Sequence, residues 1–172
     1  ISGLFVVRAY TEDVFPGAVY YAIDGTTWIE VTKPWNSTKV IDGKHRITIM
    51  TEDEADHRTD FDIEVVVDNT APIISQATIV PGQSFSGVQT LRFYAYDSIG
   101  IRQVQLSIDE RAPFEIYRGE GGLYYEYLFD TRTVKDGDHL IKVECLDRAG
   151  NTMASSYGIK VDNTGPEIDM DY

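Results

Sequence analysis

Apolar and polar residues alternate one by one along most of the chain, which is the period of a β-strand with one buried face. The clearest alternating segments in the second half of the chain are Leu91–Ala95, Val104–Ile108, His139–Cys145 and Ser155–Val161. Matching segments in the first half are Phe5–Ala9, Val19–Ile23, His45–Thr51 and Phe61–Val67. No stretch shows a helical period of useful length, so the pattern predicts an all-β protein.

Turn residues separate these segments at short intervals. Asp13–Gly17 and Asp97–Gly100 each predict a turn, and Trp28–Val31 and Phe114–Tyr117 predict a short aromatic strand that follows. The segment Gly119–Leu128 predicts a hairpin and then a strand. Turns spaced about 8 to 12 residues apart, with roughly seven strands in each half, predict β-sandwiches.

The chain repeats itself. The segment Asp42–Ile49 returns as Asp136–Val143, an offset of 94 residues (136 − 42), and the same offset carries Asp68–Pro72 onto Asp162–Pro166. A unit of this size is a whole domain rather than one turn of a solenoid. We therefore expect one folding unit used twice, an arrangement typical of spacers, stalks and binding arrays.

The repeat also predicts domain boundaries. We expect one domain over residues 1–70, a second over 71–165, and a tail or the start of a following unit over 166–172. Pro72 is expected to open the first strand of the second domain, because proline is tolerated at the first residue of a strand. The first domain has no counterpart of this segment and is expected to lack its first strand.

A family resemblance rests on these repeated residues. The run from Asp136-Gly137 through Asp147 to Asn151, followed by Asp162-Asn163-Thr164 and Pro166, resembles the immunoglobulin-like and fibronectin-III-like tandem domains of bacterial and archaeal secreted and cell-surface proteins. The first unit departs from it where Glu54–His57 replaces the Ala-Gly-Asn turn. The resemblance implies two tandem immunoglobulin-like β-sandwiches, an extracellular or cell-surface location, and neighbouring domains of the same parent protein as partners.

Charge and hydropathy exclude some partners. The 15 basic residues against 28 acidic ones leave a net charge of −13, so a surface that neutralises nucleic-acid phosphates is not expected. No stretch approaches the roughly 18 apolar residues that a membrane span needs. We expect no nucleic-acid binding and no membrane insertion.

The nucleophilic and basic residues do not predict an enzyme. The single cysteine, Cys145, lies on the inward side of an alternating strand and is expected to be a buried thiol. His45 and His139 each follow an Asp-Gly turn by two residues, and their repetition favours a structural role at a sandwich corner. We predict a non-catalytic structural or adhesive repeat pair of a larger secreted or cell-surface protein.

Carboxylates in the turns are candidate calcium ligands, since calcium takes hard oxygen donors. Aspartate and asparagine turns also form without metal, because their side chains bond the backbone of the same turn, so a calcium site and a metal-free turn are both possible interpretations. No other cofactor is expected. The candidate metal ligands are Asp53, Asp56, Asp60, Asp62, Asp68, Asn69, Asp147 and Asn151.

Aromatic side chains offer an alternative function, because exposed rings stack on the apolar faces of sugars. The chain would then be an accessory carbohydrate-binding module of an extracellular hydrolase. Cross-strand packing is the competing explanation for aromatic residues in strands. The candidates are Trp28, Trp35, Tyr124, Tyr125 and Tyr127. The run Asn36-Ser37-Thr38 is in addition a glycosylation sequon at Asn36, as expected for an extracellular protein.

Overall fold

The computed structural model of the chain describes residues 1–12, 17–76, 78–80, 82–118 and 124–169. The predicted all-β class is confirmed: these residues form strands and two short 3₁₀ turns, with no helix that could cross a membrane. Contacts divide the chain into two compact units, Ile1–Thr70 with Ala149–Asn151, and Ala71–Arg148 with Thr152–Tyr172.

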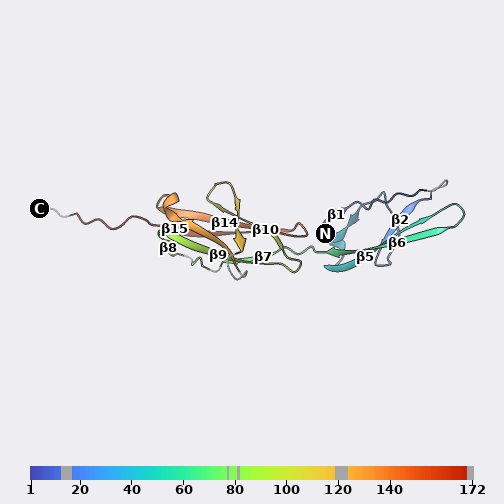
Figure 1. The fold of residues 1–172 in the computed structure, drawn as a ribbon, viewed down its shortest axis with the longest axis horizontal. Coiled ribbons are helices and arrows are strands. Elements are labelled where there is room, and N and C mark those ends of the chain that lie inside the picture. Colours follow the sequence, from blue (N-terminus) through green and yellow to red (C-terminus); the bar gives the residue numbers. More distant parts are fainter. Residues whose placement is uncertain (13–16, 77, 81, 119–123, 170–172) are drawn as a thin grey trace. The chain divides into compact units, whose positions relative to one another are not determined.

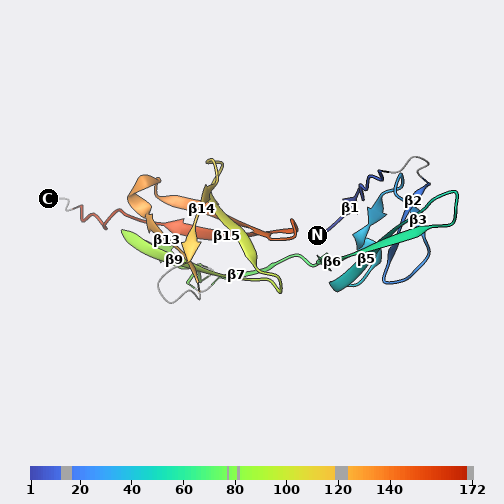
Figure 2. The same ribbon diagram turned by 45° about the vertical axis from the view of Figure 1, so that its right-hand side comes forward.

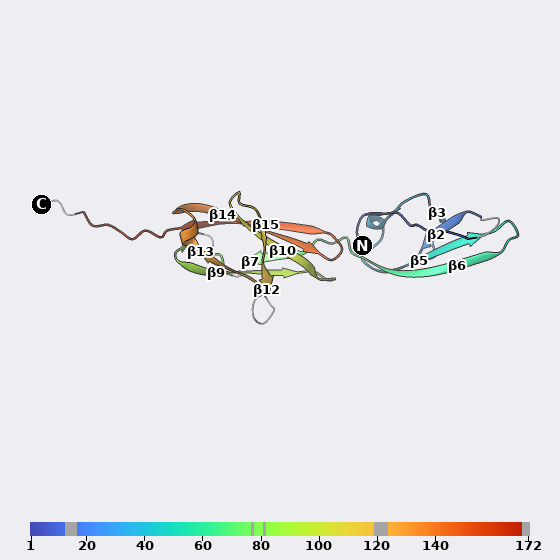
Figure 3. The ribbon, with the colours of Figure 1, turned by 45° about the horizontal axis from the view of Figure 1, so that its top comes forward.

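The second unit is a β-sandwich of two sheets, which the ribbon shows as two layers (Figures 1 and 3). One sheet has the order β11 (Phe114–Glu115), β10 (Ile101–Ile108), β14 (Gly137–Asp147), β15 (Thr152–Val161) and β8 (Ser84–Phe85). The other has the order β12 (Tyr117–Arg118), β13 (Tyr125–Asp130), β9 (Val88–Tyr96) and β7 (Ile73–Gln76). All pairs are antiparallel except β15 with β8, which is parallel.

The core of the second unit lies between these sheets. Inward-facing residues alternate along β9, where Leu91, Phe93 and Ala95 are buried, as the sequence pattern predicts. The facing strand β14 buries Ile141, Val143 and Cys145 in the same way. The expected buried cysteine is therefore confirmed, and desolvation raises the pKa of its thiol to about 11.

The first unit has one sheet of full size, ordered β3 (Ile29–Glu30), β2 (Val19–Ile23), β5 (Gly43–Glu52) and β6 (Arg58–Val67). Its second layer consists of the short pair β1 (Leu4–Phe5) and β4 (Trp35–Asn36), with β1 on one side of the larger sheet (Figure 2). Tyr21, Ile23, Trp35, Ile47 and Val67 form the buried core between them.

Three sequence predictions differ from the structure in extent. The strand expected over Phe5–Ala9 ends at Phe5, because no described strand pairs with the backbone of residues 6–9. The aromatic segment Phe114–Tyr117 splits into β11 and β12, which join different sheets. The strand expected to open at Pro72 covers Ile73–Gln76, so Pro72 directly precedes it. Residues 119–123 of the predicted hairpin and 13–16 of the predicted turn lie outside the described residues.

The other predicted strands are confirmed, and the repeat preserves register as well as sequence. Gly43 pairs with Val67 in the first unit, and Gly137 pairs with Val161 in the second, at the offset of 94 residues. Each unit has a 3₁₀ turn before this hairpin, η1 (Ser37–Lys39) and η2 (Thr131–Thr133).

Candidate functional site

The repeated Asp-Asn-Thr segment closes one end of the second unit by hydrogen bonds. The backbone N–H of Asn163 donates to Asp136 Oδ1 at 2.9 Å, and the Thr164 hydroxyl donates to the other oxygen of the same carboxylate. The side-chain amide of Asn163 donates to the carbonyl of Thr131 in η2 at 3.3 Å. The segment thereby ties the exit of β15 to the turns that precede β14.

The first unit repeats this network with its own residues. The N–H of Asn69 donates to Asp42 Oδ1 at 2.7 Å, and the Asn69 amide donates to the Ser37 carbonyl at 3.2 Å. Hydrogen bonds from the threonine hydroxyls lower the pKa of Asp42 and of the corresponding Asp136. For Asn69, a candidate metal ligand, this geometry favours hydrogen bonding within the unit.

Both repeated histidines bridge a carboxylate and a backbone carbonyl. His45 Nδ1 lies 2.6 Å from Asp24 Oδ2, and its Nε2 lies 2.7 Å from the Ile41 carbonyl oxygen. His139 makes the corresponding contacts at 2.8 Å with Asp109 and at 2.7 Å with the Lys135 carbonyl. An imidazolium donates from both nitrogens and satisfies both acceptors, so the expected corner role is confirmed.

The hydrogen bond with Asp24 and the bond with the Ile41 carbonyl raise the pKa of His45. Burial opposes protonation of His139, but its bonds with Asp109 and the Lys135 carbonyl outweigh burial and raise its pKa as well. The partner carboxylates change in the opposite direction. Backbone hydrogen bonds and the histidines lower the pKa of Asp24 and Asp109.

Three of the four predicted calcium ligands in and after the β5–β6 turn have a local side-chain hydrogen-bond partner. Asp53 accepts the N–H groups of Ala55 and His57 at 2.8 and 2.9 Å, which makes a self-bonded aspartate turn. Asp60 pairs with Arg58, and Asp62 accepts the Thr48 hydroxyl at 2.7 Å. Asp56 has a left-handed backbone with φ of 61° and is exposed. These carboxylates do not converge on a shared point in the described structure.

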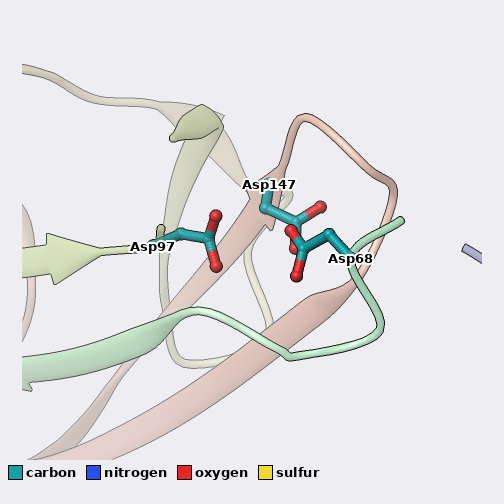
Figure 4. Close-up of side chains that lie close together, drawn as sticks. All are labelled: Asp68, Asp97 and Asp147. Atoms are coloured by element: carbon teal, nitrogen blue, oxygen red, sulfur yellow. The ribbon is translucent and has the colours of Figure 1, made fainter. Parts of the chain in front are cut away.

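Two carboxylates do converge inside the second unit. Asp97 and Asp147 are buried and offer oxygens within 4.8 Å of one another (Figure 4, where Asp68 is drawn with them). Asp97 Oδ1 accepts the N–H groups of Ile99 and Gly100 at 2.8 and 3.0 Å. Both charges add to the burial that raises the pKa of Cys145. Their oxygen donors are of the kind that calcium takes.

Sequence reasoning found Asp147 but missed Asp97, which it assigned to a turn. The alternating pattern held the missing signal. Asp97 continues the inward row of Phe93 and Ala95, just as Asp147 continues the row of Val143 and Cys145. Projecting each strand one step past its end would have placed both carboxylates on the inner faces.

The remaining candidate ligands lie at the ends of elements. Asp68 is fully buried, and its Oδ1 accepts the N–H of Thr70 at 3.2 Å, which is the local bonding expected to end the strand. The Asn151 amide, which groups with the first unit, donates to the carbonyls of Asp68 and Thr70 at 2.9 and 3.1 Å.

The predicted sugar-binding aromatics do not form one platform, and two of them are corrected to core residues. Trp35 is 6% exposed beside Phe5, and Tyr125 is 8% exposed, so neither ring is available to a ligand. Their strands turn these positions inward. Trp28 is 37% exposed under the guanidinium of Arg58. Tyr127 packs on Phe114 with ring centroids 4.8 Å apart, and Tyr124 is half-buried.

An aromatic pair that sequence reasoning missed lies on the outer face of β9. Tyr94 and Tyr96 stack at an interplanar angle of 5° with centroids 6.5 Å apart, and Tyr96 is 53% exposed. Their spacing of two residues, on the polar side of the pattern, was the available signal. Asn36 caps η1 by accepting the N–H of Thr38, and its glycosylation stays a prediction.

Comparison with known proteins bears on the fold. No family model and no curated protein matches the chain. Among solved structures, the fibronectin(III)-like modules of Clostridium thermocellum CbhA align over 95% of this chain and 87% of theirs, with 18% identity and a TM-score of 0.52. The fold is that of immunoglobulin-like and fibronectin-III-like tandem modules. The predicted fold class is confirmed, and likeness at this identity extends to the fold alone.

Two further structures are similar over smaller shares of their own length. The endo-beta-1,4-mannanase of Thermotoga petrophila aligns over 56% of this chain and 21% of its own, with 21% identity and a TM-score of 0.49. A tetra-tandem repeat from the extending region of a large adhesion protein aligns over 88% of this chain and 43% of its own, with 18% identity and a TM-score of 0.44.

Proposed function

We propose that the chain is a non-catalytic structural and adhesive module pair of a larger secreted or cell-surface protein. The observation that carries this proposal is the use of the repeated polar residues. In each unit the repeated polar side chains form the hydrogen bonds that close the ends of the sandwich. In the first unit these residues are His45, Asp42 and Asn69, and their counterparts act in the second. Each unit thus uses the same residues at corresponding positions to hold its ends together.

The strand order of the second unit suits a module under tension. β8 runs parallel to β15, with Ser84 opposite Lys160 and Phe85 opposite Val161, and the N–H of Asp162 donates to the Phe85 carbonyl at 3.0 Å. Force that enters before β8 and leaves after β15 pulls these strands past each other, so their hydrogen bonds are loaded together. In the first unit the N–H of Asp68 donates to the Ile1 carbonyl in the same way.

Single-molecule stretching of the chain between fixed handles tests this function. Two unfolding steps are expected, one of about 20 nm for the first unit and one of about 30 nm for the second, at about 3.4 Å per released residue. Phe85→Pro removes the backbone N–H and the buried ring at this position of β8 and should lower the force of the longer step only. Extension without force peaks would contradict a mechanical role.

Calcium binding is a second proposal, supported by the donors in the second unit. Two buried carboxylates whose oxygens lie within 4.8 Å of one another repel each other, and a bound cation would offset this repulsion. The ion of this proposal binds Asp97 and Asp147. Metal binding by Asp68 and Asn151, which group with the first unit, stays a separate prediction.

A calcium titration followed by thermal melting tests this proposal. Calcium at 100 times its dissociation constant stabilises the folded unit by about 2.7 kcal/mol, and Asp147→Asn should abolish the effect. Asp162→Asn is the matched control, because Asp162 is exposed. An unchanged melting temperature at millimolar calcium would remove the proposal.

The accessory carbohydrate-binding module remains the alternative function, and the exposed Tyr94–Tyr96 pair is the observation that favours it. Flat stacked rings on a sheet face can contact a sugar. A soluble polysaccharide that retards the chain in a native gel, with retardation lost in Tyr96→Ala and kept in Tyr127→Ala, would support this function over a purely mechanical one.

A further inference from the structure

The strand β15 of the second unit has one edge that is open over most of its length. On one side β15 pairs with β14 from Thr152 to Val161, without a register shift. On the other side the short strand β8 pairs only with Lys160 and Val161 in the described part of the chain. The edge over residues 152–159 therefore has no strand partner among the described residues.

Backbone groups of alternate residues point out of this open edge. The N–H of Asp162 donates to the Phe85 carbonyl, so the even-numbered residues of this strand turn their N–H and C=O groups away from β14. Along the open part of the edge these residues are exposed: Thr152, Ala154, Ser156 and Gly158. A row of backbone donors and acceptors on an edge strand is a template for pairing with another strand.

The first unit carries charged side chains on the corresponding edge. The offset of 94 residues places β6 on β15, and the register agrees: Arg58 pairs with Glu52, just as Thr152 pairs with Leu146. In β6 the four matching positions are all charged: Arg58, Asp60, Asp62 and Glu64. Charges on an edge strand oppose its pairing with another strand. In β15 the same four positions carry small uncharged side chains, so this protection is missing.

Residues 152–159 carry none of the other features that protect an edge. This run contains neither proline nor a charged residue, and its pairing with β14 has no bulge. Met153 lies in the inward-facing row of the strand and is nevertheless 42% exposed. Tyr157, in the same row, packs on Phe93 with ring centroids 5.7 Å apart. The open edge thus offers an apolar row beside its backbone groups.

The same edge of a second copy is the partner that fits this chemistry. The chain has a net charge of −13, so two copies approach each other with least repulsion at an uncharged surface. A two-fold axis at Ser155 sets Ala154 opposite Ser156 of the second copy. The same axis sets Met153 opposite Tyr157 of the second copy. A thioether beside an aromatic ring is a favourable contact.

We propose that the open β15 edges of two copies pair as antiparallel strands about a two-fold axis at Ser155. The N–H and C=O groups of Ala154 bond those of Ser156 in the second copy, and the symmetry repeats these bonds. A two-fold contact uses both edges, so association stops at the dimer. Two short strands bury little area, so the dimer is weak and its population grows with concentration. The proposed mechanical role needs only one copy, so either proposal can fail while the other stands.

Sedimentation of the full chain up to millimolar concentration tests this contact. The average mass should rise from that of one chain toward that of two, and not beyond. Ala154→Lys with Ser156→Lys sets like charges opposite each other and should weaken the dimer about tenfold or more. The matched control, Ala154→Lys with Ser156→Glu, sets opposite charges at the same places and should keep the dimer. Circular dichroism checks that both variants are folded.

Proline substitutions test the backbone contact without adding charge. The N–H of Ser156 points away from β14, so Ser156→Pro keeps the pairing within the unit and removes the hydrogen bonds that this N–H donates to the second copy. Association should weaken. Asp62→Pro makes the same change at the corresponding position of β6 and should leave association unchanged. A chain that stays monomeric at millimolar concentration overturns the proposal, and so does association that the two lysines leave unchanged.

Disulfide trapping tests the register. Ser155 faces Ser155 of the second copy across the axis, so Ser155→Cys should oxidise to a linked dimer. Thr152→Cys is the control: this position is more exposed, but it lies opposite Gly158 of the second copy and should link more slowly. The native Cys145 is buried and does not compete. Linking of Thr152→Cys faster than Ser155→Cys would overturn the register and, with it, the two-fold contact.

Discussion

The two units share one set of polar motifs but differ in how much sandwich they build. Among the residues that the structure describes, the second unit places two full sheets around a core of sixteen buried residues. The described part of the first unit has one full sheet, a second layer of two short strands, and a core of five buried residues. Both nevertheless close their ends with the same Asp-Asn-Thr network and the same histidine bridge.

This difference separates two kinds of stabilisation. The end-closing hydrogen bonds join turns and strand ends that the pairing of β5 with β6, and of β14 with β15, brings together, so they form in either unit. Burial of the sheet face depends on a covering layer, so residues at corresponding register positions differ in solvent exposure between the two units. Cys145 is 1% exposed, while its counterpart Thr51 is half-buried in an open groove that Phe61 and Ile63 also line. Polar motif and apolar core are thus separable parts of this fold.

The largest expected effect comes from removing one aromatic core side chain in each unit. Trp35→Ala and Phe129→Ala remove residues at corresponding positions, each at a cost of about 3 to 5 kcal/mol. We expect Trp35→Ala to unfold the first unit, because its core is small, while Phe129→Ala leaves the second unit folded with a lower melting temperature. Amide NMR spectra resolve the units separately. Equal losses in both units would contradict the difference in core size.

The next test removes the end-closing amide. Asn163→Ala breaks the bonds to η2 and leaves polar partners unsatisfied, and we expect it to destabilise the second unit by about 3 kcal/mol in urea unfolding. Asn69→Ala should cost the first unit a similar amount, because the network is the same. Gln103→Ala is the control, because this side-chain amide donates to Glu115 and lies outside both networks. A cost confined to one unit would show that the networks are not equivalent.

The histidine bridges predict a smaller, pH-dependent effect. His139→Ala should lower stability by about 1 to 3 kcal/mol at neutral pH. The raised pKa of His139 contributes stability that is present in full below its unfolded value of about 6.5 and is lost as pH rises through the folded-state pKa. The lowered pKa of Asp109 contributes stability that is present above about 3.9 and is lost as pH falls.

The pair therefore stabilises the unit most between these limits. Unfolding of His139→Gln and the unmodified chain at about pH 5.5 and pH 9 checks this sign, since the difference should shrink at the higher pH. His45→Gln should behave alike in the first unit. A difference that grows with pH would contradict the ionised bridge.

The smallest effect concerns reactivity rather than stability. Burial that raises the pKa of Cys145 to about 11 should make it inert to iodoacetamide at pH 8. A second thiol introduced by Thr51→Cys occupies the same register position beside the open groove and should react at least about tenfold faster. Mass spectrometry of the two peptides from one molecule gives both rates. Equal rates would mean that the groove is covered.

The sequence alone determined the elements that depend on local pattern. Alternation located strands β2, β5, β6, β9, β10, β14 and β15, because side-chain direction in a strand follows from period alone. The repeat revealed that one architecture is used twice, and the Asp-Gly positions marked the histidine corners. These inferences held because each rests on residues close together in the chain or on their exact recurrence.

Tertiary structure decided everything that depends on what lies opposite a strand. Residues 6–10 have the alternation of a strand but form none, since no described strand pairs with them. Trp35 and Tyr125 face inward, although their aromatic side chains suggested a sugar-binding surface. Asp97 follows β9 and lies close to Asp147 of β14, which belongs to the other sheet. The sheet that packs opposite a residue decides whether the residue is buried in the core, available to a ligand, or exposed at an edge. The pattern along the sequence does not specify which residues lie opposite.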